Sequence, residues 1–424
     1  MNRRLQFLCV FLFSSVLGWS VDIDADAYGS LTDYLNGIYG IDDNAGLTAF
    51  PVLNIPIGGR SEGMAGAYSA VADDVSFIEF NPAGSSMLEI SELAFFHNNW
   101  IADVKIEALA YAARFNNLGI GLSGKWLYLP FTQYGYFGDR LSKGYYSEAV
   151  AVLNGSYNLF PGYYFGGVSV GLNLKGAFRS VPDFADNITE VVTTGSGKEQ
   201  SAASVMADVG ILTRFNLFKF YNSRDRNMSL ALVARNLGPA ALGDPLPTVA
   251  VAGVSYRPIR PLMMSFDFSL PVNMLDISLS EKPYWAAGLS VTATSFLSMR
   301  AGLLMKAGNI RAVVGSAVSL QYISLDVNYT LDLLTQIQPL NRVALGVRFD
   351  LGDNGRKAKS DLVDEYYLAG LDAYSNSRDA EARIMFEKVL ELSPRFEPAI
   401  EALKSLDNYE QLNKRIDEMR RIQY

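Results

Sequence analysis

Long stretches of the chain alternate between apolar and polar residues. Between Ile323 and Leu331 the odd positions are apolar, and Ser, Asp, Asn and Thr stand between them. The segments 264–270 and 343–350 repeat this pattern. A period of two is typical of β-strands with one face toward an apolar environment and the other toward a polar one. Both a soluble β-sandwich and a membrane barrel have such strands.

The number of these segments and their connections favour the barrel. Bacterial barrels join their strands alternately by short periplasmic turns and longer outer loops. Most connections here follow that order, with a tight turn at Asn116-Asn117 and long loops expected at 131–145 and 180–200. We therefore expect a mainly β fold, a transmembrane antiparallel β-barrel of about fourteen strands in residues 91–352. The strands are expected to begin near Ser91, Lys105, Leu118, Tyr146, Phe165, Ala202, Met228, Thr248, Leu262, Tyr284, Leu297, Arg311, Tyr322 and Asn341.

The composition agrees with a membrane location. Apolar residues make up 49% of the chain and charged residues only 19%. Beyond the N-terminus, however, no apolar run approaches the roughly 20 residues that a membrane-spanning helix needs. Closed β-structure is the other way to satisfy the backbone in hydrocarbon. The expected surroundings are therefore outer-membrane lipid.

Residues 1–20 have the features of a secretory signal peptide. Arg3 and Arg4 precede a short apolar stretch, and small residues follow it. An uncleaved anchor is the alternative interpretation. The single cysteine, Cys9, lies in this segment, so the mature chain would have no thiol for a disulfide, for catalysis or for a metal site.

The last part of the chain, residues 353–424, is much richer in charge than the barrel region and predicts a separate helical domain. Gly370, Ala382, Phe386 and Pro394 have the spacing of a tetratricopeptide (TPR) repeat. A single repeat is visible, whereas stable arrays usually need about three. A TPR-like domain in the periplasm and a plain helical hairpin packed under the barrel both remain open. Repeat helices usually bind peptides, so a periplasmic protein is a candidate partner.

The chain offers little for enzymatic or nucleic-acid chemistry. Removing Arg3 and Arg4 takes the net charge from −8 to −10, and we find no Lys/Arg cluster for phosphate contacts. His97 is the only histidine, and its sequence neighbours Asn98 and Asn99 cannot both share its face of a strand. We expect no catalytic residue, no metal site and no cofactor.

The segment from Gly58 to Gly84 carries a specific resemblance. It contains Gly63-Met64-Ala65-Gly66-Ala67, then Ala72-Asp73-Asp74, and then Asn81-Pro82-Ala83-Gly84. In these features it resembles the N-terminal segment of FadL-type outer-membrane transporters and of the related PorV-type barrels. With its helical tail, the whole chain is similar to an uncharacterised family of FadL-like spirochaete proteins.

The resemblance implies that residues 21–90 fold inside the barrel as a hatch. Gly63, Met64, Gly66, Asp73, Asp74, Asn81 and Pro82 would then form the hatch or contact a ligand. Asp73 and Asp74 would face lumen groups such as Arg300 or Arg348. The alternative is that the segment forms a strand and turn of the wall.

An aromatic group lies near the outer end of the third expected strand. Trp126, Tyr128, Phe131 and Tyr134 fit an interfacial girdle, and they also fit an apolar groove for a lipid-like ligand. The resemblance implies passive uptake of small hydrophobic molecules such as long-chain fatty acids. The alternative is a PorV-like scaffold or secretion accessory, whose tail docks periplasmic proteins.

Overall fold

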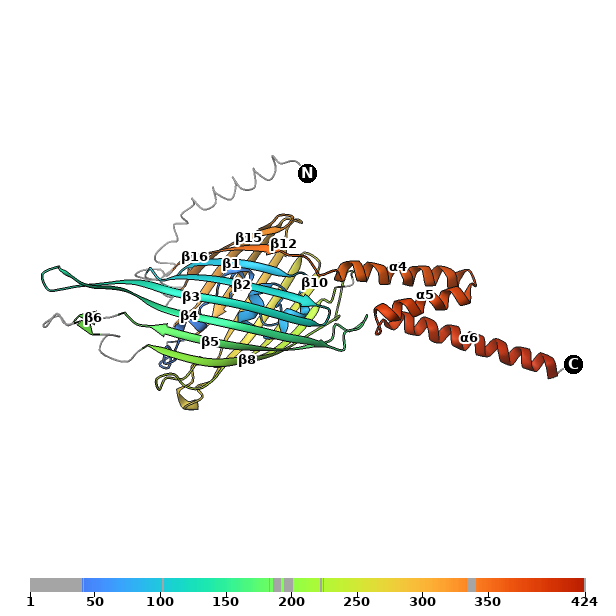
Figure 1. The fold of residues 1–424 in the computed structure, drawn as a ribbon, viewed down its shortest axis with the longest axis horizontal. Helices are drawn as coiled ribbons and strands as arrows, with labels where there is room; N and C mark the ends of the chain where they lie inside the picture. Colours follow the sequence, from blue (N-terminus) through green and yellow to red (C-terminus); the bar gives the residue numbers. More distant parts are fainter. Residues whose placement is uncertain are drawn as a thin grey trace, which may run out of the picture.

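The computed structural model describes residue 40 and residues 42–100, 103–182, 184–185, 192–193, 201–221, 223, 225–333 and 341–422. Within this part of the chain, fourteen strands form one closed antiparallel barrel, in which β1 pairs with β16 (Figure 1). The predicted fold class is confirmed. The expected signal peptide, residues 1–20, and positions 21–39 and 41 of the expected hatch lie outside the described residues. The barrel strands are β1 (Glu92–Asn99), β2 (Lys105–Phe115), β3 (Leu118–Tyr134), β4 (Arg140–Leu159), β5 (Val168–Ser180), β8 (Ala202–Phe215), β9 (Met228–Leu237), β10 (Val249–Ile259), β11 (Leu262–Pro271), β12 (Tyr284–Thr292), β13 (Leu297–Met305), β14 (Arg311–Ser319), β15 (Ile323–Asp332) and β16 (Arg342–Asp350).

One connection differs from the expectation. The predicted loop at 131–145 is wrong, because β3 and β4 continue as a paired hairpin as far as Tyr134 and Arg140. Most side chains there are exposed or half-buried on both faces, so the sequence loses its alternation although the strands continue. The two short strands β6 (Phe184–Ala185) and β7 (Val192–Thr193) form a separate hairpin in the connection between β5 and β8.

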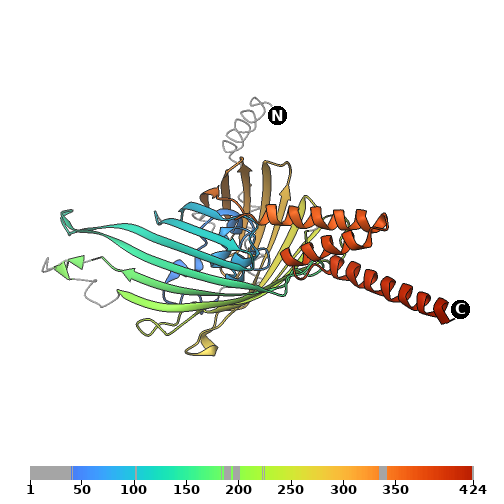
Figure 2. The ribbon, with the colours of Figure 1, turned by 45° about the vertical axis from the view of Figure 1, so that its right-hand side comes forward.

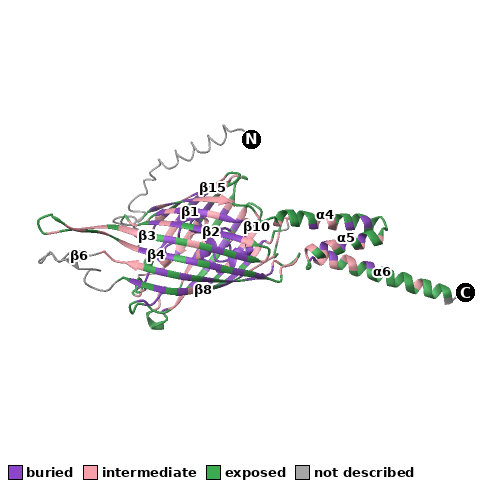
Figure 3. Ribbon diagram, viewed as in Figure 1, coloured by how far each residue is buried: buried purple, intermediate pink, exposed green. Residues whose placement is uncertain are grey.

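The barrel has two distinct ends (Figures 1 and 2). The β3–β4 hairpin projects from one end, which we call the hairpin end, and the helices α4 to α6 lie beyond the other, which we call the tail end. Burial alternates along the strands between them (Figure 3). In β15, for example, Leu325 is 44% exposed on the outer face, whereas Asp326 and Asn328 are buried in the lumen. The wall therefore has an apolar outside and a polar inside, as a membrane barrel requires.

Residues 49–90, which we call the inner segment, occupy the lumen. They form the short helices η1 (Pro51–Asn54), α3 (Gly59–Gly63), η2 (Val75–Glu79) and η3 (Pro82–Met87). The helix η3 contacts β2, β3, β4, β5 and β8, while α3 contacts β13 to β16 on the other side. Phe50, Phe77 and Ile78 are fully buried in the core between this segment and the wall.

The tail consists of α4 (Arg356–Ser375), α5 (Asp379–Leu392) and α6 (Glu397–Ile422). A Cβ atom on Gly370 would lie 2.6 Å from Phe386 Cε1, so only glycine lets α4 and α5 approach this closely. Ala382 and Phe386 are fully buried in the same small core. Among the described residues, no helix combines the length and the apolar character that crossing a membrane would need.

Two sets of contacts attach the tail to the barrel. In the turn after β4, Tyr163 N donates to Glu397 Oε2 at 2.5 Å, and the Tyr163 ring packs on Phe396 with centroids 5.0 Å apart. At the start of α4, Arg356 Nη1 donates to Leu88 O at 2.8 Å. The pKa of Asp353, just before α4, lies below its ordinary value because the backbone N–H groups of Lys357 and Gly355 donate to its carboxylate.

Candidate functional site

The candidate site is the inner segment together with the lumen that it fills. Asp74 caps η2, where its carboxylate accepts from Ser76 N at 3.0 Å. Asn81 caps η3 in the same way by accepting from Ala83 N, and Pro82 fits the first helical turn because it has no N–H to satisfy. The Asn81 amide also donates to Ser69 O at 2.8 Å. These caps stabilise the short helices from within the inner segment, and wall side chains such as Asn154 and Asn173 add hydrogen bonds to the carbonyl groups of Pro82 and Ile78.

Wall glycines set how closely the inner segment packs. A Cβ atom on Gly119 would lie 2.1 Å from the carbonyl carbon of Ser85, and one on Gly302 would lie 2.5 Å from Ala65 N. No other residue type fits such contacts between backbones. On five described strands a Cβ atom on a lumen-facing glycine would lie less than 3.0 Å from the inner segment: Gly119, Gly171, Gly210, Gly288 and Gly302.

Buried ion pairs join the inner segment to the wall. Asp74 accepts from Arg348 Nη1 at 2.9 Å, and Glu62 accepts from Arg342 Nε at 3.1 Å. Lys125 pairs with Glu79 on the opposite side. All these groups are largely shielded from solvent, so removal of one partner would leave a charge without compensation.

The sequence-predicted residues fall into two groups in this network. Asp74 meets Arg348 of β16, which the sequence suggested as a lumen partner. Arg348 also contacts Asp326, and Asp326 binds Arg300 in turn. Asp73 instead pairs within the inner segment, with Arg60 at 2.8 Å.

The glycine-methionine motif packs against the same side of the wall as this network. Met64 is fully buried with Tyr68 and Phe80, and Gly66 has a φ of +81°, a conformation that favours glycine. A Cβ atom on Gly63 would meet Asn328 Oδ1 at 2.6 Å. Asn328 Nδ2 in turn donates to Gly59 O at 2.7 Å. The motif is therefore used for close packing against β13 to β15.

The inner segment separates two polar cavities. The hairpin-end cavity encloses about 210 Å³ and is lined by Trp100, Arg235, Arg311 and Arg342 among others. Trp100 lies under two guanidinium groups, 3.8 Å from Arg342 Cζ and 5.1 Å from Arg311 Cζ at its ring centroid. The tail-end cavity encloses about 260 Å³ on the other side of the segment. In the described residues no group of three or more His, Cys, Asp or Glu side chains is placed to hold a metal ion.

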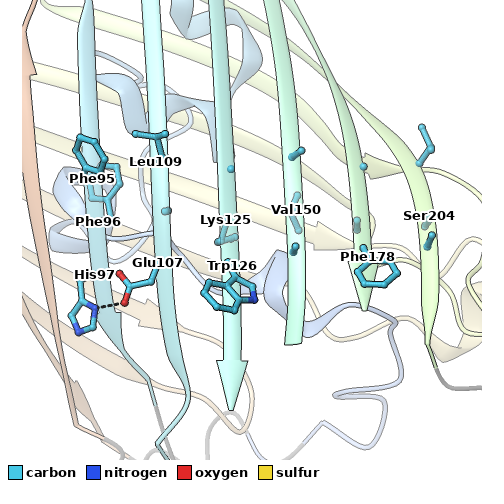
Figure 4. A pocket seen from close by; sticks show the side chains of 18 of the residues that line it. Phe95, Phe96, His97, Glu107, Leu109, Lys125, Trp126, Val150, Phe178 and Ser204 are labelled. Atoms are coloured by element: carbon cyan, nitrogen blue, oxygen red, sulfur yellow. Dashed lines mark hydrogen bonds and ion pairs between the residues drawn. The ribbon is translucent and has the colours of Figure 1, made fainter. Parts of the chain in front are cut away.

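The outer face of the wall contains an apolar hollow of about 1250 Å³ (Figure 4). Its floor is a patch of small outward-facing residues on β3, β4, β5 and β8, and Phe95, Leu109, Trp126 and Phe178 form its rim. The floor residues are Gly124, Ala149, Ala151, Gly176 and Ala203. No side chain of the protein fills the space over Gly124 and Gly176, where a Cβ atom would meet nothing within 4 Å.

The four predicted groove residues are not all at this hollow. Trp126 lines it, and Tyr128 stacks on Trp126 with centroids 4.6 Å apart. Phe131 and Tyr134 lie farther along β3, in the projecting hairpin. At the rim, His97 Nδ1 and Glu107 Oε1 lie 2.8 Å apart (Figure 4).

Sequence reasoning missed Glu62, Arg342 and the wall glycines. Each is an ordinary residue of its segment, and its role depends on a partner far away in the chain. A signal for the glycines was present, since Gly119, Gly171, Gly210 and Gly302 all stand at polar-face positions of alternating segments. A strand glycine often marks close approach of another backbone.

Residues 40–354 match the Uncharacterised protein family (UPF0164). The chain belongs to this family. Two Treponema pallidum (strain Nichols) proteins of the same description are 29% and 26% identical to it, over 85% and 86% of this chain and 83% and 76% of their own lengths. This confirms the resemblance to an uncharacterised family of spirochaete proteins.

Among solved structures, the chain is similar to the CymD monoaromatic hydrocarbon channel and to the Pseudomonas putida toluene transporter TodX. Both are 11% identical to it. The likeness to CymD covers 72% of this chain and all of CymD with a TM-score of 0.49. The likeness to TodX covers 65% of this chain and 92% of TodX with a TM-score of 0.41.

Proposed function

We propose that this protein is an outer-membrane channel for passive uptake of small hydrophobic molecules, such as long-chain fatty acids, and that the inner segment is its gate. The arrangement of the inner segment carries the proposal. It separates a cavity at each end of the lumen, and it is held by side-chain ion pairs and close packing, outside the strand ladder. Such a segment can move while the barrel stays closed.

The outer hollow supports a hydrophobic ligand. Its floor and most of its rim are apolar, and its volume of about 1250 Å³ exceeds the range of about 300–1,000 Å³ of most small-molecule pockets. A ligand partitioned into the membrane would meet this surface first. The lumen cavities are more polar, so we assign capture to the hollow and passage to the lumen.

Filling the hollow tests capture. Gly176→Leu places a side chain on the floor, and Gly155→Leu is the matched control, since Gly155 also faces outward into open space but does not line the hollow. Equilibrium binding of labelled palmitate to purified protein should weaken about tenfold in Gly176→Leu and remain unchanged in Gly155→Leu. Equal affinity in both variants would contradict capture at this surface.

A second candidate function is a scaffold whose tail docks periplasmic proteins. It is favoured by α6, which extends beyond the tail core and exposes Tyr409, Leu412 and Met419 at helical spacing. A photo-crosslinking residue at Leu412, compared with one at Lys414 on another face, should capture one protein specifically. Equal or no capture at the two positions would argue against the scaffold.

A further inference from the structure

The tail-end cavity is a pocket between the inner segment and the ends of the strands. Val71, Asp73 and Met87 line it from the inner segment, and the turn after β4 closes one side. Four arginines contribute to its lining: Arg114, Arg214, Arg226 and Arg257. They come from the end of β2, the end of β8, the segment before β9 and the tail end of β10.

These arginines use neutral partners. Arg214 donates to the carbonyl oxygens of Val71 at 2.8 Å and of Met87 at 3.2 Å. Arg226 donates to Gly162 O at 2.7 Å and Tyr163 O at 2.9 Å. None of the ion pairs found among the described residues involves any of the four.

Two guanidinium groups keep donors free. In the described structure the only hydrogen bond of the Arg257 guanidinium goes to the Met263 sulfur, a weak acceptor, at 3.7 Å. Arg226 Nε is buried without a partner. The cavity is therefore lined by N–H donors that no group in the described part of the chain satisfies.

The carboxylates nearby balance these charges only in part, because three acidic side chains (Asp73, Glu89 and Asp225) line the cavity beside the four arginines. Asp73 is already paired with Arg60 at 2.8 Å. Asp225 accepts from Ser223 Oγ, and Glu89 is exposed at the edge of the cavity. An excess of guanidinium groups over carboxylates in a partly buried space favours an anion with oxygen acceptors.

We propose that the tail-end cavity binds an oxyanion, namely a carboxylate or phosphate group. Arg257 and Arg226 contact the anion, whereas Arg214 and Arg114 add positive charge and hold the adjacent inner segment through its carbonyl groups. The anion is either a small soluble one or the charged group of an amphiphile. This inference does not require a channel, because an anion site at the mouth is equally compatible with a scaffold.

Isothermal titration calorimetry on the full-length protein in detergent tests the site. The probes are hexanoate, inorganic phosphate and neutral hexanol. Arg257→Gln should weaken anion binding about tenfold, as expected for loss of a charged hydrogen bond. Arg260→Gln is the matched control, because it removes the same charge three residues farther along the chain, in the turn after β10 and outside the cavity. Arg226→Gln gives a second variant should Arg257→Gln fold poorly.

The outcomes separate the sources of the anion. Binding of phosphate that Arg257→Gln weakens indicates a soluble anion, whereas weakened binding of hexanoate alone indicates an amphiphile; both support the site. Unchanged hexanol binding shows that the effect is one of charge. Anion affinities in Arg257→Gln and Arg226→Gln that equal those of the parent, or that fall equally in Arg260→Gln, would overturn the proposal. None of these measurements depends on conductance. The channel proposal can therefore be disproved while the anion site is confirmed.

Discussion

Gly171 of β5 lies directly against Pro82 of the inner segment: a Cβ atom on Gly171 would be 2.3 Å from the carbonyl carbon of Pro82. Ser169 on the same strand donates to Ala83 O at 2.7 Å. Wall and inner segment therefore meet through backbone, at a distance that tolerates no side chain. The fit of the inner segment depends on the absence of side-chain atoms as much as on attractive contacts.

Gly171→Val should displace the inner segment and leave the barrel intact. Valine suits a strand, but its side chain would occupy the position of the Pro82 carbonyl group. We expect a higher single-molecule conductance in planar bilayers than for the parent. Gly155→Val, which adds the same side chain on the outer face, should conduct like the parent. Equal conductance in all three proteins would show that the segment packs elsewhere.

Asp74→Asn should loosen the inner segment more than Asp73→Asn. Asp74 binds Arg348 of the wall in a nearly dry site, where removal of one partner typically costs about 3–5 kcal/mol. Asp73 binds Arg60 within the segment and is partly exposed. Limited trypsin digestion at Arg60 should be faster in Asp74→Asn than in Asp73→Asn. Faster cleavage in Asp73→Asn alone would show that Asp73, and not Asp74, holds the inner segment in place.

Deletion of residues 22–89 should give a folded barrel with a larger conductance. The fourteen barrel strands form a closed ladder that does not include the inner segment, so the deletion creates no strand edge in lipid. The freed Lys125 and Arg342 would face water in the opened lumen. Bilayer recordings and the β-type circular dichroism spectrum are the measurements. A deleted protein that folds and conducts no better than the parent would rule out the gate.

Leu325→Arg should destabilise the protein by about 2–4 kcal/mol if the site lies at mid-bilayer. Leu325 faces outward, and Ser324, its neighbour on the other face, is the control for which a much smaller cost is expected. Asn328 is not an equivalent control, because it is fully buried against Gly59. Urea unfolding in lipid vesicles gives the free energies. Equal costs for Leu325→Arg and Ser324→Arg would mean that the faces are wrongly assigned.

Tyr163→Ala should loosen the tail against the barrel and leave the tail core intact. It removes the barrel ring that packs on Phe396, and Tyr409→Ala on the free part of α6 is the control. Spin labels on the turn after β4 and on α5 would report a broader distance distribution in Tyr163→Ala only. An unchanged distribution would show that the remaining contacts and the linker position the tail.

The sequence predicted the barrel wall well because the membrane imposes a strict period of two. Lys105, Leu118, Ala202 and Met228 begin strands where expected. The period fails in the projecting β3–β4 hairpin, where most side chains on both faces are exposed or half-buried. The pairing continues there, so β4 begins at Arg140 and not near Tyr146. Strand structure continues there without a hydrophobic signal.

The site was only partly predictable, for a different reason. The motif at Gly58–Gly84 indicated which residues lie inside, but its partners come from strands that follow much later in the chain. Asp74 binds Arg348, which lies 274 residues later in the chain, and Glu62 binds Arg342, which lies 280 residues later. No local pattern encodes such pairings, since they depend on how the barrel closes.

The position of Arg342 and Arg348 on β16 has a consequence for biogenesis. The inner segment precedes every wall strand in the chain, yet two of its anchors belong to the final strand, the one that pairs with β1. During assembly the segment must therefore wait unanchored on that side until the seam between β1 and β16 forms. Completion of the wall and anchoring of its interior are then one event, so an unfinished barrel lacks the full attachment of the inner segment.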